Sequence, residues 1–207
     1  MGKKVISMAV GQPSDPAPAP VIEAARRALE AGRLGYTNAL GLDVLRRRIA
    51  QFYERHYGVS VDPARVAVTT GSSSGFNLAF LSMFDAGDRV AVTRPGYPAY
   101  RNIMAALGIE AVEIPVGPGE GSLTAERLEE AHRAGPLRGL LFASPANPTG
   151  AVMPGTDMER LVKAAEGLGI AVISDEIYHR LSHVGPDRTA LSVSDNVVII
   201  NSFSKYY

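Results

Sequence analysis

The sequence predicts an α/β protein with a mostly parallel sheet flanked by helices, and three observations support this fold class. Short runs of Val, Ile and Leu alternate with stretches of helical periodicity along the chain after Gly58. Strands separated by helices form βαβ units, whose strands lie parallel in one sheet. The runs are almost continuously apolar, as expected of strands that helices cover on both faces.

The same patterns place each element along the chain. The expected strands are Val66–Thr70, Arg89–Thr93, Ala111–Pro115, Gly139–Ala143, Ile170–Ser174 and Val197–Asn201. The expected helices that alternate with them are Ser72–Phe84, Pro98–Leu107, Ala125–Ala134 and Thr156–Leu168. A proline-rich extended arm is expected at residues 11–20, followed by one helix from Pro20 to Gly32 and another from Leu42 to Tyr57.

Composition excludes several classes of protein. Apolar residues make up 46% of the 207 residues and charged residues 20%, which allows a buried core. Basic and acidic residues number 21 each, so no net charge favours nucleic acid or an anionic membrane as a partner. The chain has no cysteine, which excludes disulfides, thiolate metal sites and a cysteine nucleophile.

Two further features concern location and metals. The apolar run at residues 5–10 is too short for a signal peptide or a membrane span, so we expect a soluble, cytoplasmic protein. The four histidines show no metal-ligand spacing, so we expect no metal site. The basic run Arg46–Arg48 on the second helix is expected to face solvent.

Unusual residues follow five of the expected strands. Ligands of parallel α/β sheets collect at the carboxyl ends of the strands, so these segments are the candidates for a binding site. They are Gly71–Ser74, Pro95–Pro98, Asn147–Gly150, Asp175–Tyr178 and Ser202–Lys205. Their coincidence at one edge of the sheet is more informative than any single segment.

Two of these segments suit a phosphorylated, nitrogen-containing ligand. Gly71, Ser72 and Ser73 open a helix, where free amides and hydroxyls seat a phosphate, although a serine N-cap has the same sequence. Asp175 ends a buried strand, where a carboxylate needs a partner such as a protonated heterocyclic nitrogen. A helix cap and an acid that binds Mg²⁺ are the alternatives for Asp175.

The remaining segments supply an amine, an amide and two phenols. Lys205 follows a buried strand, where desolvation favours the neutral amine that forms Schiff bases, although a surface lysine is the ordinary alternative. Asn147 lies in a turn and could donate to a ligand oxygen. Tyr97 could cover a flat ligand or fill the core, and Tyr178 could bind the same ligand or lie on a helix surface.

Taken together, the motifs resemble the class I/II aminotransferases of the aspartate aminotransferase superfamily, which are pyridoxal 5'-phosphate (PLP) enzymes of fold type I. The resemblance rests on six motifs in order: Y-T-N-A-L-G (36–41), V-T-T-G-S-S-S (68–74), G-D-R-V-A-V-T-R-P-G-Y-P (87–98), N-P-T-G (147–150), S-D-E-I-Y (174–178) and S-F-S-K (202–205). It spans essentially the whole chain. It divides the chain into an arm and first helix at 1–32 and a partial PLP-binding large domain at 33–207.

The resemblance implies a role for each matching residue. Lys205 would bind PLP covalently and later move a proton, and Asp175 would keep the pyridine nitrogen protonated. Asn147 and Tyr178 would bind the phenolic oxygen of the ring, and Tyr97 would stack on its face. The phosphate would be held by Gly71, Ser72, Ser73 and Ser202. Tyr36 would reach the phosphate of the neighbouring subunit, which implies a homodimer, and Gly11 would lie near the substrate carboxylate.

The resemblance also implies that part of the protein is missing. Members of the family continue past this lysine with a further strand of the sheet and a C-terminal small domain, so we expect residues 1–207 to be a piece of a longer parent protein. The parent would transfer an amino group between an amino acid and a 2-oxo acid, whereas the piece alone would be inactive. Three alternatives stay open: another PLP reaction (lyase, decarboxylase or synthase), a PLP-binding sensor domain, and a fragment that binds no cofactor.

Overall fold

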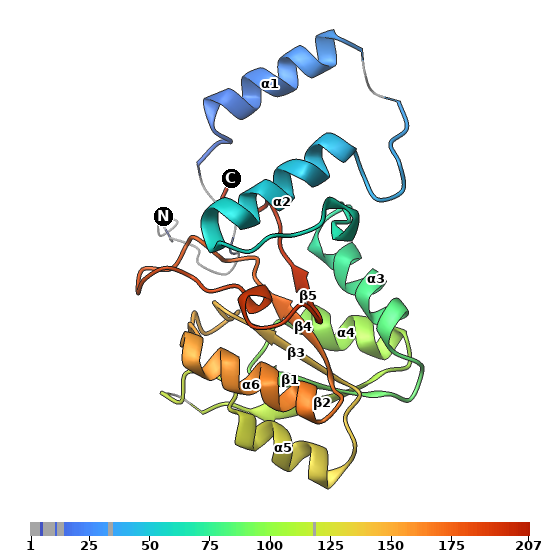
Figure 1. The fold of residues 1–207 in the computed structure, drawn as a ribbon, viewed down its shortest axis with the longest axis vertical. Helices are drawn as coiled ribbons and strands as arrows, with labels where there is room; N and C mark the ends of the chain where they lie inside the picture. Colours follow the sequence, from blue (N-terminus) through green and yellow to red (C-terminus); the bar gives the residue numbers. More distant parts are fainter. Residues whose placement is uncertain (1–4, 6–10, 12–14, 33–34, 118) are drawn as a thin grey trace.

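The computed structural model describes residues 5, 11, 15–32, 35–117 and 119–207. Helices and strands alternate along this part of the chain from residue 72 onward (Figure 1). The helices are α1 (Ala19–Glu30), α2 (Asp43–Tyr57), α3 (Ser72–Met83), α4 (Pro98–Ala106), α5 (Ala125–Ala134) and α6 (Gly155–Gly167). The strands are β1 (Arg89–Arg94), β2 (Glu110–Pro115), β3 (Gly139–Ala143), β4 (Ala171–Asp175) and β5 (Val197–Ile200), and two short 3-10 turns are η1 (Pro63–Arg65) and η2 (Ala190–Ser192).

The five strands form one parallel sheet in the order β2-β1-β3-β4-β5. Strands are added to one side of β1 up to β2 and to its other side from β3 onward, because β3 pairs with β1 on the side opposite to β2. The predicted α/β fold class with a parallel sheet flanked by helices is therefore confirmed. The predicted bounds of these five strands differ from the observed ones by one residue at most.

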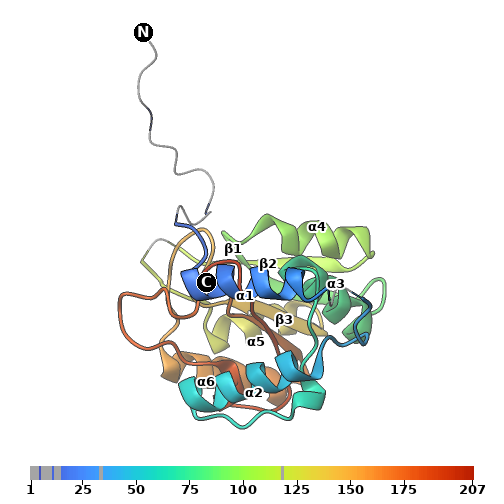
Figure 2. The ribbon, with the colours of Figure 1, turned by 90° about the horizontal axis from the view of Figure 1, so that it is seen from above.

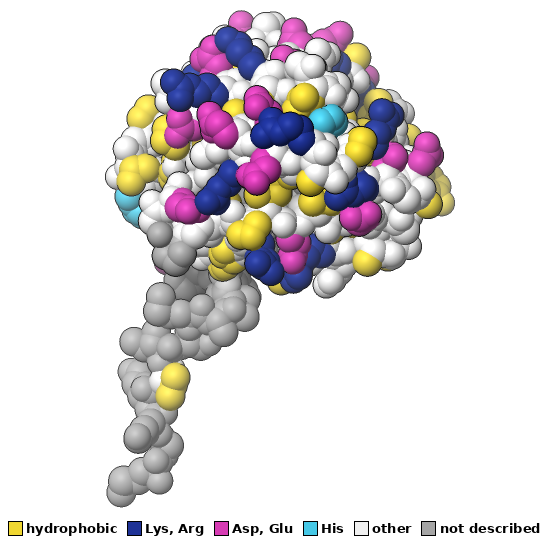
Figure 3. Space-filling view, turned by 90° about the horizontal axis from the view of Figure 1, so that it is seen from below, with side chains coloured by type: hydrophobic (Ala, Val, Ile, Leu, Met, Phe, Trp, Pro, Cys, Tyr) yellow, Lys and Arg dark blue, Asp and Glu magenta, His cyan; other side chains and the backbone are white. Residues whose placement is uncertain are grey.

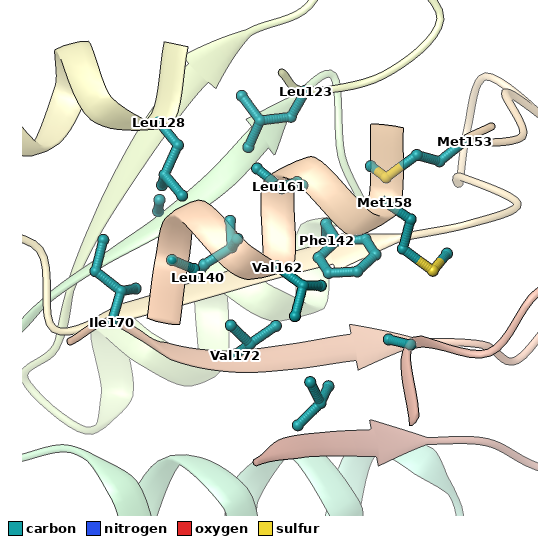
Figure 4. Close-up of a cluster of buried hydrophobic side chains, with 14 of the residues drawn as sticks. Leu123, Leu128, Leu140, Phe142, Met153, Met158, Leu161, Val162, Ile170 and Val172 are labelled. Carbon is teal, nitrogen blue, oxygen red and sulfur yellow. The ribbon is translucent and has the colours of Figure 1, made fainter. Parts of the chain in front are cut away.

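Side chains that alternate along each strand enter two separate cores. On one face, Leu140, Phe142 and Val172 pack under α5 and α6 with Leu161 and Val162 of α6, and Figure 4 shows Val162 directed toward Val172. On the other face, Leu141 and Ile173 belong to a cluster with apolar residues of α3 and α4 (Phe76, Phe80, Tyr100 and Met104). Figure 2 shows α3 and α4 on one side of the sheet and α6 on the other. Cover on both faces explains why the strands are continuously apolar.

The predicted strand at Val66–Thr70 is wrong. Within the described chain, residues 66–70 pair with no strand, and the Val68 amide donates instead to the carbonyl of Leu40 at 3.0 Å. Residues 66–69 and 197–200 line the same groove, which has a volume of about 960 Å³. A β-strand requires a hydrogen-bonded neighbour, and β5 is paired only with β4.

The prediction for the basic run on α2 is wrong at one position. The Arg46 side chain is only 13% exposed, and its guanidinium donates to the carbonyls of Val66 at 2.7 Å and Ala64 at 3.1 Å. Arg46 also pairs with Asp43 one turn earlier on the helix. It thereby ties α2 to the segment that carries residues 66–70.

Surface charge is mixed, and the described helices are short. On the face in Figure 3, acidic and basic side chains are interspersed among apolar ones. None of the helices in the described part of the chain is long and apolar enough to cross a membrane.

Candidate functional site

The carboxyl ends of neighbouring strands bring the sequence motifs to one edge of the sheet. In the register of the sheet, Asp175 at the end of β4 lies between Ala143 of β3 and Ile200 of β5. The segment with Asn147 follows β3, and the segment with Lys205 follows β5. The site therefore arises because parallel strands all end on the same side.

Asp175 is a buried carboxylate with one donor on each oxygen. It is 4% exposed, and its Oδ1 accepts from the Ile177 amide at 3.0 Å. Its Oδ2 accepts from the hydroxyl of Tyr100, a residue of α4. Burial raises the pKa of Asp175, whereas the hydrogen bonds from Tyr100 and Ile177 act in the opposite direction. A cationic group placed beside Asp175 would offset the remaining cost of its charge.

Lys205 reaches across to the N-terminal part of the chain. Its ammonium group donates to the carbonyl oxygen of Gly11 at 2.7 Å. It also lies 5.9 Å from the centroid of the Tyr178 ring. Gly11 itself approaches Tyr178, since a Cβ atom added to Gly11 would lie 3.8 Å from the tyrosine hydroxyl. The structure thus brings three of the predicted residues together.

Two tyrosines and an asparagine complete this side of the site. Tyr97 is 37% exposed, and its ring meets that of Tyr100 edge-to-face, with the centroids 5.5 Å apart. Burial raises the pKa of Tyr178, the charges of Asp175 and Tyr97 raise it further, and a hydrogen bond with the Asn147 side chain lowers it. Asn147 and Tyr178 also line one cavity, of about 430 Å³. Tyr97, Asn147 and Tyr178 therefore lie close enough to act on one ligand.

The start of α3 has the geometry of an anion seat. Gly71 precedes the helix with φ +86°, a value that favours glycine, and no atom lies within 4 Å of the position its Cβ would take. The Gly75 amide donates to the carbonyl of Gly71, so the amides of Ser72 and Ser73 precede the first helical hydrogen bond and have no acceptor within the helix. Ser202, whose hydroxyl donates to Ser204, lines the same groove as Gly71 and Ser72.

Tyr36 is not part of this cluster. Its side chain is fully exposed, with a relative exposure of 108%. Its predicted contact is with a neighbouring subunit, which a single chain does not test. Among the described residues, no cluster of His, Asp or Glu side chains has the arrangement of a metal site.

A second buried acid, Glu176, is not among the residues that the sequence motifs predict for the site. Its Oε1 accepts from the hydroxyl of Thr189 at 3.0 Å, the amide of Ala190 at 2.9 Å and the hydroxyl of Ser174 at 3.2 Å. Its Oε2 lies 3.5 Å from Nδ1 of His179 and has no hydrogen-bond partner among the described residues. Burial raises the pKa of Glu176 to about 7 and lowers that of His179 to about 4. This acid holds η2 against the end of β4, on the side away from Asp175.

Comparison with known proteins identifies the family. A family model described as aminotransferase class I and II matches residues 3–207. The chain belongs to this family. The valine–pyruvate aminotransferase of Mycobacterium tuberculosis is 50% identical over 206 residues, which are 98% of this chain and 53% of the relative.

Solved structures show the same relationship in three dimensions. The crystal structure of an aminotransferase from Mycobacterium tuberculosis is 51% identical, with a TM-score of 0.90, and the match covers 96% of this chain and 54% of the other. Aspartate aminotransferase from Thermus thermophilus, in a structure with maleate, is 34% identical, with a TM-score of 0.89. The match covers 95% of this chain and 52% of the other. The chain therefore spans about half the length of the relatives it matches.

Proposed function

We propose that these residues form the cofactor-binding half of a PLP-dependent aminotransferase, and that the parent protein moves an amino group between an amino acid and a 2-oxo acid. The observation that carries the proposal is Asp175, a buried carboxylate at the end of a central strand. Its oxygens are fixed by Tyr100 and Ile177, and each retains a lone pair for a further donor. A buried acid held in this way suits the protonated nitrogen of a heterocycle.

The other residues fit the remaining parts of the same cofactor. The free amides at the start of α3, with Gly71, Ser72, Ser73 and Ser202, suit a phosphate. Asn147 and Tyr178, which line one cavity, suit an oxygen on the ring. Tyr97, held edge-to-face by Tyr100, suits the face of an aromatic ring.

When bound, PLP supplies an electron sink for the charge that develops as a bond at the substrate Cα breaks. Asp175 would hold the proton on the ring nitrogen, and the fixed position of its oxygens is what makes this effective. Lys205 would attach the cofactor and then carry the proton at its Nζ. The Gly11 carbonyl that accepts from Nζ at 2.7 Å supports this role, because it fixes the amine beside Tyr178. Gly11 would then lie near the substrate carboxylate.

The same proposal covers partners and location. The relative with 50% identity is named for valine and pyruvate, so these are the first substrates to test. We propose a homodimer in which Tyr36 reaches the neighbouring phosphate seat, since the exposed Tyr36 ring is free to contact another subunit. We also propose a cytoplasmic location, in keeping with the absence of cysteine from the chain.

Chemical trapping in the parent protein tests the central assignment. Borohydride reduction should fix PLP on Lys205, with the label identified by peptide mass, and the purified parent should transaminate valine with pyruvate. Lys163, which is exposed on α6 and paired with Glu159, is the matched control, and Lys163→Ala should keep full labelling. Label on Lys163, or a Lys205→Ala variant that still becomes labelled, would refute the assignment. Release of CO₂ or another product without amino transfer would instead favour a different PLP reaction.

A further inference from the structure

Tyr100 is a buried phenol that belongs to none of the sequence motifs yet contacts two of the candidate site residues. It lies in the first turn of α4, three residues after Tyr97, and is 4% exposed. Its hydroxyl donates to Oδ2 of Asp175, which is 75 positions away in the sequence. A spacing of three residues at the start of a helix places Tyr97 and Tyr100 on the same side, toward the end of β4.

The ring of Tyr100 is held between two other rings. It meets Tyr97 edge-to-face at 5.5 Å with an interplanar angle of 82°, and Phe76 at 5.0 Å with an angle of 63°. Phe76 belongs to α3, the helix whose first turn forms the anion seat. One side chain therefore contacts the carboxylate, the stacking ring and the phosphate-seat helix. Aromatic pairs in these geometries are stabilising and fix the orientation of both rings.

The chemistry of the contact is asymmetric. Burial raises the pKa of Tyr100 far above its ordinary range, and the neighbouring charge of Asp175 raises it further. Tyr100 is thus a neutral phenol at every physiological pH and always has a proton to donate. Its hydrogen bond is the larger of the two that oppose the effect of burial on the pKa of Asp175. The hydroxyl therefore favours the ionised carboxylate at a site where burial disfavours it.

We propose that Tyr100 is a positioning residue for the cofactor ring, whose hydroxyl orients and stabilises the Asp175 carboxylate and whose ring supports Tyr97. The inference rests on the proposed function, because it assigns Asp175 to the ring nitrogen and Tyr97 to the ring face. It adds a residue that sets the strength of the interaction between Asp175 and that nitrogen. Without the hydroxyl, Asp175 becomes more basic and draws the shared proton away from the ring.

The test compares Tyr100→Phe with wild type in the parent protein. The variant keeps the ring contacts and removes only the hydroxyl. Tyr57→Phe is the matched control, because it removes a hydroxyl that bonds Nδ1 of His179 at 2.9 Å, and neither residue is assigned a role toward the cofactor. Four quantities are measured: the dissociation constant for PLP, the pH midpoint at which the absorbance band of bound PLP changes, kcat for transamination and KM for transamination. Urea unfolding of each apo variant tests whether the variant folds.

In Tyr100→Phe, PLP should bind about tenfold more weakly, as expected when a hydrogen bond to a charged group is lost. The pH midpoint should rise, because a ring nitrogen that is less protonated withdraws less electron density. The value of kcat should fall, and KM should change little. Tyr57→Phe should leave all four quantities at wild-type values.

An unchanged midpoint in Tyr100→Phe would overturn the proposal, even if stability fell, since a purely structural role alters only stability. An equal shift of the midpoint in Tyr57→Phe would also overturn it. If wild-type parent binds no PLP, the proposed function fails and this inference fails with it. If wild type binds PLP and Tyr100→Phe is indistinguishable from it, only this inference fails.

Discussion

Replacing Glu176 with Gln should change the pH dependence of folding stability. The carboxyl group is fully buried and accepts from Ser174, Thr189 and the Ala190 amide through one oxygen. Gln keeps an oxygen acceptor of the same shape at this position but cannot ionise. The substitution therefore isolates the free energy of carrying a charge at this site.

The size of the effect follows from the pKa of Glu176, which is about 7 in the folded chain and has an ordinary value of 4.5. A raised pKa contributes stability that is fully present below 4.5 and is lost as the pH rises through 7. The difference of 2.5 pH units (7 minus 4.5) corresponds to about 3 kcal/mol as an upper bound. His179, whose pKa is lowered to about 4, acts in the opposite direction, because its contribution is lost as the pH falls. In wild type the two effects partly cancel.

Urea unfolding of the parent protein from pH 4.5 to 8 measures this effect. The free energy of unfolding of Glu176→Gln minus that of wild type should rise with pH by up to about 3 kcal/mol and level off above pH 7. Glu130→Gln is the control, since Glu130 is exposed on α5 and its substitution should give a flat difference. A flat difference for Glu176→Gln, or one that falls with rising pH, would refute the reasoning.

Three further substitutions test other parts of the chain. Asp175→Asn in the parent should fold and bind PLP but lose most turnover, and near-wild-type transamination rates would contradict the role of Asp175. Leu161→Ala, at a fully buried position of α6, should lower the free energy of unfolding by about 2–5 kcal/mol in urea, and a loss under 1 kcal/mol would mean that this core is loosely packed. Gly71→Ala, at φ +86°, should weaken PLP binding by straining the phosphate seat, and unchanged affinity would show that the loop adapts.

Much of the fold follows from local sequence because each observed strand carries its own signal. Gly139–Ala143, for example, is apolar throughout and is observed with the predicted bounds. Val66–Thr70 has the same kind of signal but forms no strand, because pairing depends on a neighbour that local sequence does not reveal. For a similar reason the sequence predicts a solvent-facing Arg46, since the carbonyl of Val66 that it binds lies 20 positions away.

Some residues of the candidate site are likewise predicted by their position in the sequence, and others only by their contacts in the folded chain. Lys205, Asp175 and Asn147 stand at strand ends, where position alone indicates a ligand site. Tyr100 and Glu176 act through contacts between distant segments, so their partners emerge only in three dimensions. A weak signal for each was present: Tyr100 is one helical turn from Tyr97, and Glu176 follows Asp175, so that alternation along the strand places its side chain on the opposite side.

Helix α1 has a consequence for measurements on residues 1–207 alone. None of its twelve residues is buried, and Figure 1 shows it clear of the sheet and its covering helices. A helix of this length gains little stability from its own hydrogen bonds in water. Its backbone amides should therefore exchange with deuterium almost as fast as those of an unfolded peptide, while those of β3 stay protected. Slower exchange of the α1 amides in the parent protein would then show, residue by residue, where another part of the parent covers the apolar side of this helix.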